Sequence, residues 1–460
     1  MDDVAYRALL DRALNGVAAW EAGFGTFETD ASMDVPRERA NAVIDELVDR
    51  LHDNYPFFHP SYAGQMLKPP HPVALAAYAA ASRINPNNHA LDGGPATAKL
   101  EREAVAWIAA MFGLREPFLG HLTSSGTIAN LEALWVASKL HPGKAIAFSA
   151  EAHYTHARMA DVLGVPTVVI PVDAKGRLSV EALEAREPAA IGTVVATAGA
   201  TSTGAVDPID EIVALAARRG WRVHADAAYG GFFVTLTDVE EARMHAPRWN
   251  ALAACDSIVV DPHKHGLQPY GCGCVLFADP NVGALYRHDS PYTYFTSTEL
   301  HLGEISLECS RAGASAAALW ATLRCIPPTS DGLGRVLLQS RRAALEAFDR
   351  ATSGGRLVPV VTPDLDIFTA APAIPGEKVA ASVVSARSER LFAACAADRG
   401  SPLHLAKWKV PRAFGALALP DVAWDRDDCV VIRSVLMKPE HARYAGRIVE
   451  RLEAWADLPV

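Results

Sequence analysis

The chain has 460 residues, of which 50% are hydrophobic and 21% charged, and its formal net charge is -10. This composition is typical of a soluble globular protein with two or three domains. The acidic balance argues against a surface for nucleic acid or anionic membranes, so we expect a small-molecule substrate.

The seven cysteines show no CxxC motif and no paired spacing. They predict reduced thiols in a cytoplasmic protein, without a disulfide framework or a metal site. The N-terminal stretch MDDVAYRALLDRAL is amphipathic and begins with acidic residues, so no secretory signal is predicted. No apolar run reaches membrane-spanning length, which predicts no membrane partner.

The first 55 residues predict two helices, in VAYRALLDRAL and in VPRERANAVIDELVDRLHDNY, where a proline occupies the first helical position. The loop GFGTFETDASMD separates them. The following segment, FFHPSYAGQMLKPPHP, is rich in proline, glycine, histidine and aromatic residues and is predicted to be irregular. It contains Gln65, a candidate substrate ligand.

From about Thr97 to Leu323, short apolar strands alternate with helices. The predicted strands are AIAFS, TVVIPV, GTVVATAG, WRVHADAA, SIVVD and GCVLFA. This alternation indicates an α/β unit with a largely parallel sheet, in which ligands lie at the carboxyl ends of the strands. The remaining pattern predicts a smaller α+β domain, which gives boundaries at residues 1–90, 91–325 and 326–460.

Polar residues follow several of the predicted strands. Ser125, Gly126 and Thr127 lead directly into a helix, where they form either a plain N-cap or a cradle for phosphate. Asp226 follows the strand WRVHA, and is either a helix cap or the partner of a cationic ring nitrogen. His153 stands at another strand end, where a lone histidine is usually structural.

The stretch VVDPHKHG places Lys264 between two histidines behind a strand that reads as buried. Most lysines are solvated surface charges. The order of a small-residue turn, His153, Asp226 and Lys264 supplies each part needed to hold pyridoxal phosphate: a helix N-terminus for the phosphate, a flat partner for the ring, a carboxylate for the pyridinium and an amine for the aldehyde.

The chain resembles the group II pyridoxal-phosphate-dependent amino acid decarboxylases. The residues that carry this resemblance are TSSGTIANLEAL, AHYTHARMADVLG, ATAGATSTGAVDPIDEI, HADAAYGGFF, DPHKHG and IRSVLMKP, and the match extends from about Val35 to the C-terminal helix. The resemblance implies the PLP-dependent transferase fold type I: a mostly parallel sheet flanked by helices, with a helical N-terminal arm and a smaller α+β C-terminal domain.

The resemblance also implies roles for individual residues. Lys264 would form the internal aldimine, with an amine whose pKa is lowered by burial. Asp226 would keep the pyridine nitrogen protonated, so that the ring accepts electrons in a quinonoid intermediate as CO2 leaves an L-amino acid and a primary amine forms. The other expected cofactor contacts are His153 and Ala228 on the two ring faces, Ser125, Gly126 and Thr127 at the phosphate with His263 nearby, and Thr197 close to the ring.

Three further expectations concern the substrate and the assembly. Arg433 would bind a substrate carboxylate, unless it is a surface arginine on an edge strand. Tyr294, favoured over Tyr292, would deliver the proton to Cα, unless both are packing aromatics. The resemblance implies a homodimer with the active site at the subunit interface, covered by the N-terminal arm.

Two other functions stay open at this point. The same motifs suit a carbon–carbon lyase, an aldolase or a decarboxylation-dependent oxidase with the same cofactor. A non-catalytic scaffold of this fold is the third reading, although a buried cation opposite a buried acid has no use there. Gln65 suits a side-chain carboxylate or a phenol equally, so the substrate is acidic, aromatic or of another kind.

Overall fold

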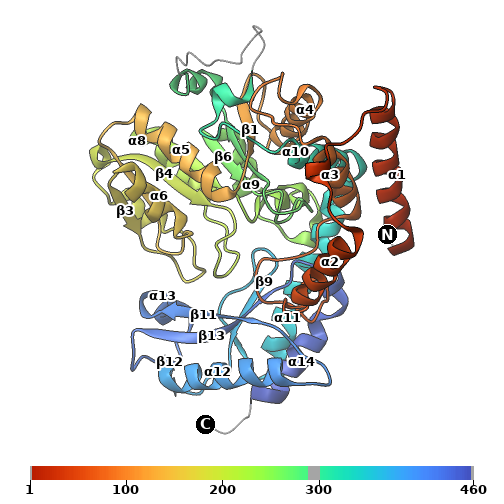
Figure 1. Cartoon of the computed structure of the whole chain (residues 1–460). Helices are drawn as coiled ribbons and strands as arrows, with labels where there is room; N and C mark the ends of the chain where they lie inside the picture. Colours follow the sequence, from red (N-terminus) through yellow and green to blue (C-terminus); the bar gives the residue numbers. More distant parts are fainter. Residues whose placement is uncertain (1–2, 288–300, 374, 457–460) are drawn as a thin grey trace.

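A seven-stranded sheet forms the centre of the larger domain in the computed structural model, which describes residues 3–287, 301–373 and 375–456 (Figure 1). From edge to edge it consists of β1 (Leu119–Thr123), β7 (Gly273–Phe277), β6 (Ser257–Val260), β5 (Arg222–Asp226), β4 (Ile191–Thr197), β2 (Ala145–Ser149) and β3 (Thr167–Ile170). In this sheet, β7 runs opposite to the other six strands, which all point in one direction. The predicted mostly parallel sheet is therefore confirmed.

The edge strand β1 is not predicted from its sequence, because LGHLT is short and its glycine and histidine interrupt the apolar pattern. It pairs with β7 in antiparallel fashion, and β7 is in turn antiparallel to β6. Hence β1 runs in the same direction as β6. Its carboxyl end, where Ser125 follows, lies at the same edge of the sheet as the carboxyl ends of β2, β4, β5 and β6.

Helices cover both faces of the sheet: α3 (Pro72–Ile84), α4 (Pro95–Met111), α5 (Gly126–Leu140), α6 (Thr155–Leu163), α7 (Val180–Glu184), α8 (Ile209–Arg219), α9 (Ala246–Asn250) and α10 (Gly313–Cys325). Strand alternation divides the core between these faces. On β4, Val194 and Ala196 pack in the cluster that contains α8, whereas Val195 packs with α5 and α6. Because Ala225 belongs to the α8 cluster, His224 and Asp226 point to the α5 and α6 face.

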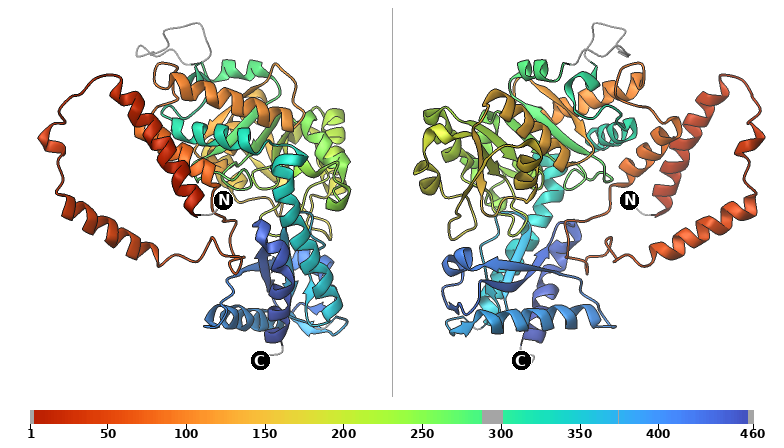
Figure 2. Two further views of the ribbon diagram at one scale, coloured as in Figure 1. Left: turned by 90° about the vertical axis from the view of Figure 1, so that its right-hand side faces the viewer. Right: turned by 60° about the vertical axis from the view of Figure 1, so that its left-hand side comes forward.

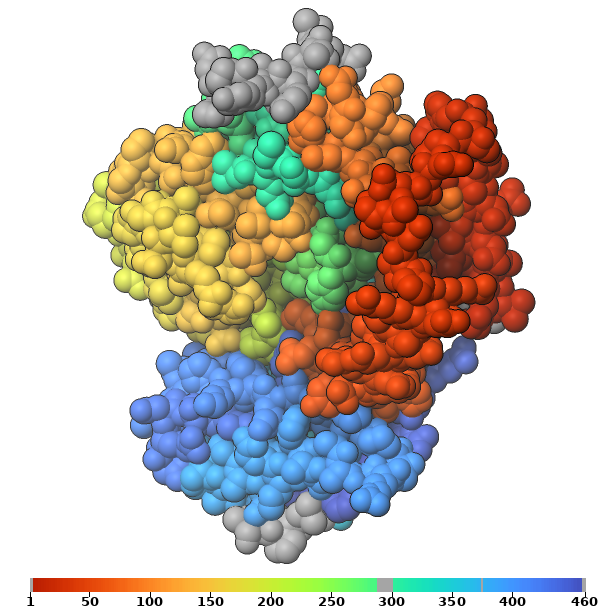
Figure 3. Space-filling view, in the orientation of Figure 1, coloured from red at the N-terminus to blue at the C-terminus, as the bar shows by residue number. Residues whose placement is uncertain are grey.

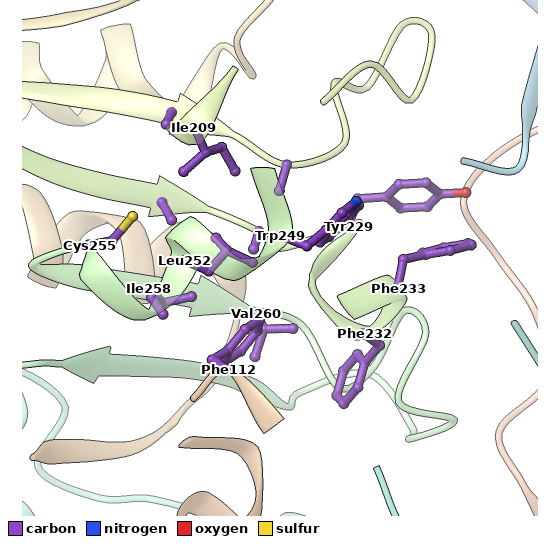
Figure 4. Packing of buried hydrophobic residues seen from close by; sticks show 14 of the residues in the cluster. Phe112, Ile209, Tyr229, Phe232, Phe233, Trp249, Leu252, Cys255, Ile258 and Val260 are labelled. Atoms are coloured by element: carbon purple, nitrogen blue, oxygen red, sulfur yellow. The ribbon is translucent and has the colours of Figure 1, made fainter. Parts of the chain in front are cut away.

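The largest core cluster contains several aromatic side chains. Figure 4 shows Phe112, Phe232 and Val260 within this cluster, while the hydroxyl of Tyr229 points away from it. That hydroxyl donates a 2.6 Å hydrogen bond to Asp366 Oδ1 in the smaller domain. Tyr229 therefore anchors the core of one domain to the polar interior between the two.

The smaller domain, at the bottom of Figure 1, carries an antiparallel sheet in the order β11 (Ala406–Pro411), β13 (Asp428–Val435), β9 (Ile367–Ala371) and β8 (Val358–Pro359). A parallel pair, β10 (Val379–Ala380) and β12 (Val422–Ala423), lies beside it. Its helices are α11 (Arg335–Gly354), α12 (Ala381–Ala397), α13 (Arg412–Ala418) and α14 (Ala445–Ala456). This mixture of helices and antiparallel strands is the predicted α+β type.

The N-terminal arm consists of α1 (Asp3–Ala22), which lies against the body of the chain, and α2 (Arg37–Leu51), which extends away from it (Figure 2). Helix α1 packs against α3, where Arg83 pairs with Glu21. The sequence predicts Pro36 at the first helical position of α2, but Pro36 is the N-cap and the helix begins one residue later, at Arg37. Within the described residues, we find no helix with the length and apolar character needed to span a membrane.

Candidate active site

A cavity of about 260 Å³ lies at the carboxyl edge of the large sheet. It collects residues from the ends of five strands that run in the same direction, as expected for a ligand site in an α/β sheet. All the predicted cofactor-contacting residues line it: Ser125, Gly126, Thr127, His153, Thr197, Asp226, Ala228, His263 and Lys264.

The N-terminus of α5 forms one wall of this cavity. Ser125 is the N-cap, and its hydroxyl oxygen accepts a 3.3 Å hydrogen bond from the backbone N–H of Ile128. The N–H groups of Gly126 and Thr127 lack intrahelical partners because they belong to the first turn. Ser125 is thus an N-cap, as one of the two predicted alternatives had it. The free N–H groups of Gly126 and Thr127, at the positive end of the helix dipole, also favour the binding of an anion.

Lys264 lies in the turn after β6 and contacts a buried acid. Its Nζ is 2.9 Å from Oδ2 of Asp261, whose side chain is 3% exposed. Burial by itself would lower the pKa of Lys264. The charge and hydrogen bond of Asp261 outweigh this effect, so the pKa of Lys264 is raised. The expectation that burial leaves this amine with a lowered pKa is wrong, because it took no account of the acid three residues earlier.

Asp226 ends β5 and accepts two hydrogen bonds. Oδ2 lies 2.7 Å from Nε2 of His156 on α6, and Oδ1 accepts a 3.2 Å hydrogen bond from the backbone N–H of Ala228. Burial acts to raise the pKa of Asp226, but the His156 hydrogen bond and the positive charges nearby hold it well below its usual range. The cavity therefore contains a fixed carboxylate that can pair with a cationic ligand.

His153 follows β2 and presents its ring to the cavity. Its Nδ1 accepts a 3.2 Å hydrogen bond from the backbone N–H of Thr155, and the Thr155 hydroxyl lies 2.7 Å from the same atom. Burial lowers the pKa of His153, which favours a neutral ring. A neutral, flat and fixed imidazole is suited to packing against an aromatic ligand.

His263, the residue before Lys264, is held in place by Cys272 and Tyr270. Its Nδ1 donates a 2.7 Å hydrogen bond to the carbonyl oxygen of Cys272, and its ring packs on Tyr270 with the centroids 4.7 Å apart. Burial lowers the pKa of His263. The second ring nitrogen, Nε2, is 3.5 Å from Asp261 Oδ2, so this histidine also borders the acid beside Lys264.

The residues present fit pyridoxal phosphate. The first turn of α5 offers donors for the phosphate, Asp226 a carboxylate for the pyridinium, and Lys264 an amine for the aldehyde. Within the described ranges, two buried polar atoms of lining residues have no hydrogen-bond partner, Oγ1 of Thr197 and Oδ1 of Asp261. Buried polar atoms without partners mark places where a polar ligand is accommodated.

Gln65 and Arg433 do not line this cavity. They line a second cavity of about 360 Å³, which shares His153, Tyr154 and Thr201 with the first. Arg433 is 5% exposed on the central strand β13, so the alternative of a surface arginine on an edge strand is wrong. The predicted proton donor Tyr294, like Tyr292, lies outside the described residues.

Three residues of the site were not predicted from the sequence. They are Asp261 beside Lys264, His156 beside Asp226, and Asn130, which lines the cavity and accepts a hydrogen bond from the buried His224. A signal was available for His156, since it follows His153 by three residues at the start of a helix and such residues share a face.

Replacement of Gly126 by alanine is expected to weaken cofactor binding by about tenfold or more, because overpacking of a closed site costs roughly 1–3 kcal/mol. A Cβ at this position would lie 2.5 Å from both carboxylate oxygens of Asp261. The measurement is the dissociation constant of pyridoxal phosphate. Gly16→Ala on α1, where a Cβ meets nothing within 4 Å, is the control. Equal affinity of the two variants would contradict the close packing described.

Sequence comparison identifies relatives of known description. Residues 38–329 match the pyridoxal-dependent decarboxylase conserved domain. A probable L-aspartate decarboxylase of Halobacterium salinarum is 34% identical over 265 residues, covering 57% of this chain and 70% of the relative. An L-tyrosine decarboxylase of Enterococcus faecium is 26% identical over 449 residues, covering 74% and 73% of the two chains.

Two solved structures show the same fold. Tryptophan decarboxylase of Catharanthus roseus, in complex with L-tryptophan, has a TM-score of 0.73, 16% identity and 99% coverage of both chains. Sphingosine-1-phosphate lyase of Burkholderia pseudomallei has a TM-score of 0.70 and 18% identity, covering 95% of this chain and 94% of the other.

The match covers more than half of the chain and includes the strand ends that build the cavity. The protein is a carboxy-lyase, and its cofactor is pyridoxal phosphate. The predicted resemblance is confirmed: the chain belongs to the pyridoxal-dependent decarboxylase family.

Proposed function

We propose that the protein removes the α-carboxylate of an L-amino acid and releases CO2 and a primary amine. The observation that carries this proposal is the presence of Lys264, Asp226 and the α5 N-terminus around one cavity of about 260 Å³. Bound pyridoxal phosphate supplies an aldehyde that links covalently to amines and a protonated ring that accepts the electron pair left by CO2.

Each side chain has a defined task in this proposal. Lys264 would hold the cofactor through its amine, the group that reacts with an aldehyde. Asp226 would pair with the pyridine nitrogen, and His153 and Ala228 would pack against the ring. Ser125, Gly126 and Thr127 would hold the phosphate with His263 nearby, and Thr197 would lie close to the ring.

The second cavity is proposed to receive the rest of the amino acid. Arg433 donates from Nε to the carbonyl oxygen of Ser202 at 3.1 Å, while its Nη2 is buried without a hydrogen-bond partner among the described residues. A free guanidinium nitrogen there suits a substrate carboxylate. Glu151 and Gln65 line the same cavity. They allow cationic or neutral polar side chains as well, and the relatives named for aspartate and tyrosine leave the choice open.

Mass spectrometry of the reaction products tests this function. The cofactor-loaded protein is incubated in D2O with single L-amino acids, including tyrosine, tryptophan, glutamate, aspartate and 2,4-diaminobutyrate. We expect an amine that has lost CO2 and carries one deuterium at Cα. Tyr294 is the proton donor predicted from the sequence, and its substitution by phenylalanine would slow this incorporation.

A carbon–carbon lyase or an oxidase is the alternative, since a lyase of the same fold is among the solved structures. The product decides between these reactions. An aldehyde with ammonia or peroxide would contradict simple decarboxylation and favour the oxidase. Cleavage of another carbon–carbon bond, with the substrate carboxylate retained, would favour the lyase.

We further propose that the protein is a homodimer in which the arm covers the neighbouring subunit near its active site. All residues of α2 are exposed, yet the helix carries an apolar stripe formed by Val43, Ile44, Leu47, Val48 and Leu51. Each of these side chains is 48–56% exposed. An amphipathic helix gains stability mainly by burying its apolar stripe, so a second copy of the chain is the natural partner.

Leu47→Asp is expected to shift the protein from dimer to monomer at micromolar concentration, because it places a charge in the middle of the stripe. Ala42→Asp introduces the same charge on the opposite side of α2 and should leave the dimer intact. Sedimentation velocity gives the oligomeric state of each variant. A Leu47→Asp protein that stayed dimeric, or a monomeric wild type, would rule out the proposed arm contact.

A further inference from the structure

His156 is a fully buried histidine directly behind the cavity. It belongs to the first turn of α6, and its ring is 0% exposed. Its Nε2 lies 2.7 Å from Oδ2 of Asp226, which is the one cavity-lining residue among the described residues that hydrogen-bonds to this ring. The rings of Phe148 and His224 pack around it, with centroids 6.1 Å and 6.3 Å away.

The direction of this hydrogen bond follows from the partners. An ionised carboxylate only accepts, so Nε2–H of His156 is the donor. The other nitrogen, Nδ1, is buried without a hydrogen-bond partner among the described residues. The bond from Nε2–H to Asp226 is therefore the one hydrogen bond that this ring makes within the described residues.

Neighbouring polar groups cannot replace this donor. His224 lies two residues before Asp226 on the same face of β5, but its Nε2 is bonded to Asn130 Oδ1 at 2.8 Å and its Nδ1 to Ser257 Oγ at 2.9 Å. Burial lowers the pKa of His224 to about 3, so this ring is neutral and has no spare N–H. Within the part of the chain that the structure describes, the other donor to the Asp226 side chain is the backbone N–H of Ala228.

The two donors therefore fix the carboxylate plane. Each oxygen of Asp226 accepts one hydrogen bond, from His156 or from Ala228, and its remaining lone pairs are left for the cavity that the residue lines. Without the His156 donor, Oδ2 would be a buried anionic atom without a partner, which favours rotation or protonation of the carboxyl.

We infer that His156 is a positioning residue: it acts through Asp226, and keeps that carboxylate ionised and directed at the pyridine nitrogen of the cofactor. The inference rests on the proposed function, in which Asp226 pairs with that nitrogen. It separates the two histidines of the sequence HYTH, since His153 lines the cavity and the ring of His156 hydrogen-bonds to the acid from outside the cavity lining.

Two substitutions of His156 separate hydrogen bonding from packing. His156→Leu retains similar volume but removes the donor, whereas His156→Gln can place an amide N–H near the position of Nε2. For His156→Leu we expect kcat to fall and cofactor release to accelerate, each by about 10- to 100-fold, as for other buried partners of active-site ligands. The KM of the amino acid should change little. For His156→Gln we expect less than about fivefold change in kcat.

The visible absorption of the holoenzyme and the release of pyridoxal phosphate during dialysis provide readouts that do not depend on turnover. In His156→Leu, the visible absorption band of the bound cofactor should be shifted, and during dialysis it should decrease faster than in His156→Gln. A double-mutant cycle with Asp226→Asn completes the test. If His156 acts through Asp226, adding His156→Leu to Asp226→Asn should alter kcat and cofactor release by less than about twofold.

The outcomes distinguish this inference from the proposed function. Equal losses in the leucine and glutamine variants, or additive losses in the double variant, would assign His156 a packing role and overturn the inference. A leucine variant with wild-type spectrum and cofactor release would do the same. If the wild type itself binds pyridoxal phosphate but does not decarboxylate any amino acid, the proposed function fails, while the spectra and release rates still decide the role of His156.

Discussion

Lys264→Ala is expected to abolish turnover, with kcat lowered by at least about 10⁴-fold, because a covalent catalyst cannot be replaced by its neighbours. Among the residues that line the first cavity, Lys264 is the only primary amine. The visible absorption of the covalently bound cofactor should disappear at the same time. The measurements are product formation by mass spectrometry and the absorption spectrum after addition of pyridoxal phosphate.

Loss of the lysine also removes the partner of Asp261. Breaking one side of a buried ion pair typically costs about 3–5 kcal/mol, so Lys264→Ala should unfold at lower temperature. The double variant Lys264→Ala/Asp261→Asn removes the unpaired charge and should recover stability without recovering turnover. Lys175→Ala, at an exposed turn position, is the control for both measurements. Wild-type turnover in Lys264→Ala would refute the proposed mechanism.

The strand ends were predictable because the sequence encodes them locally. Each buried strand is a short apolar run, and in a parallel sheet the residues after such runs meet at one edge. This reasoning suffices to bring His153, Asp226 and Lys264 into one cavity. It does not require knowledge of any contact between helices, since the sheet alone sets the positions.

The supporting residues were harder to predict because their roles depend on packing between elements. His156 reaches Asp226 only because α6 lies on the face of the sheet to which His224 and Asp226 of β5 point. The raised pKa of Lys264 likewise depends on how the turn after β6 folds Asp261 back onto the amine. Hydrophobic periodicity predicts which side of a helix or strand is buried. It does not predict which polar atom of another element a buried side chain will contact.

The substrate remains the part of the site with the weakest sequence signal, for a physical reason. The second cavity is assembled from Gln65, from the segment around Glu151, and from the smaller domain at Trp408 and Arg433. Figure 3 shows the smaller domain below the larger one, so the walls of this cavity come from different bodies of the molecule. How well this cavity fits the side chain of a substrate thus depends on how its walls are placed relative to one another, and no single sequence motif encodes that placement.

Asp226→Asn is expected to lower kcat by about 10³-fold while the protein still folds and binds pyridoxal phosphate, because the loss is mainly electrostatic. Asparagine is close in shape to aspartate, and its carbonyl oxygen can still accept from His156. A neutral amide cannot hold a proton on the pyridine nitrogen, and an unprotonated ring is a poor acceptor for the electron pair left by CO2. Steady-state kinetics and the absorption spectrum of the loaded variant measure both effects.

A second aspartate provides the control for this substitution. Asp256 precedes β6 at the opposite end of the sheet, where it accepts a 2.7 Å hydrogen bond from the backbone N–H of Val223 and pairs with Arg222. Asp256→Asn should cost some stability and leave the spectrum of the bound cofactor as in the wild type. If Asp226→Asn retained wild-type kcat, the ring would not need its protonated nitrogen, and the reaction would have to use an electron sink other than the one that this carboxylate maintains.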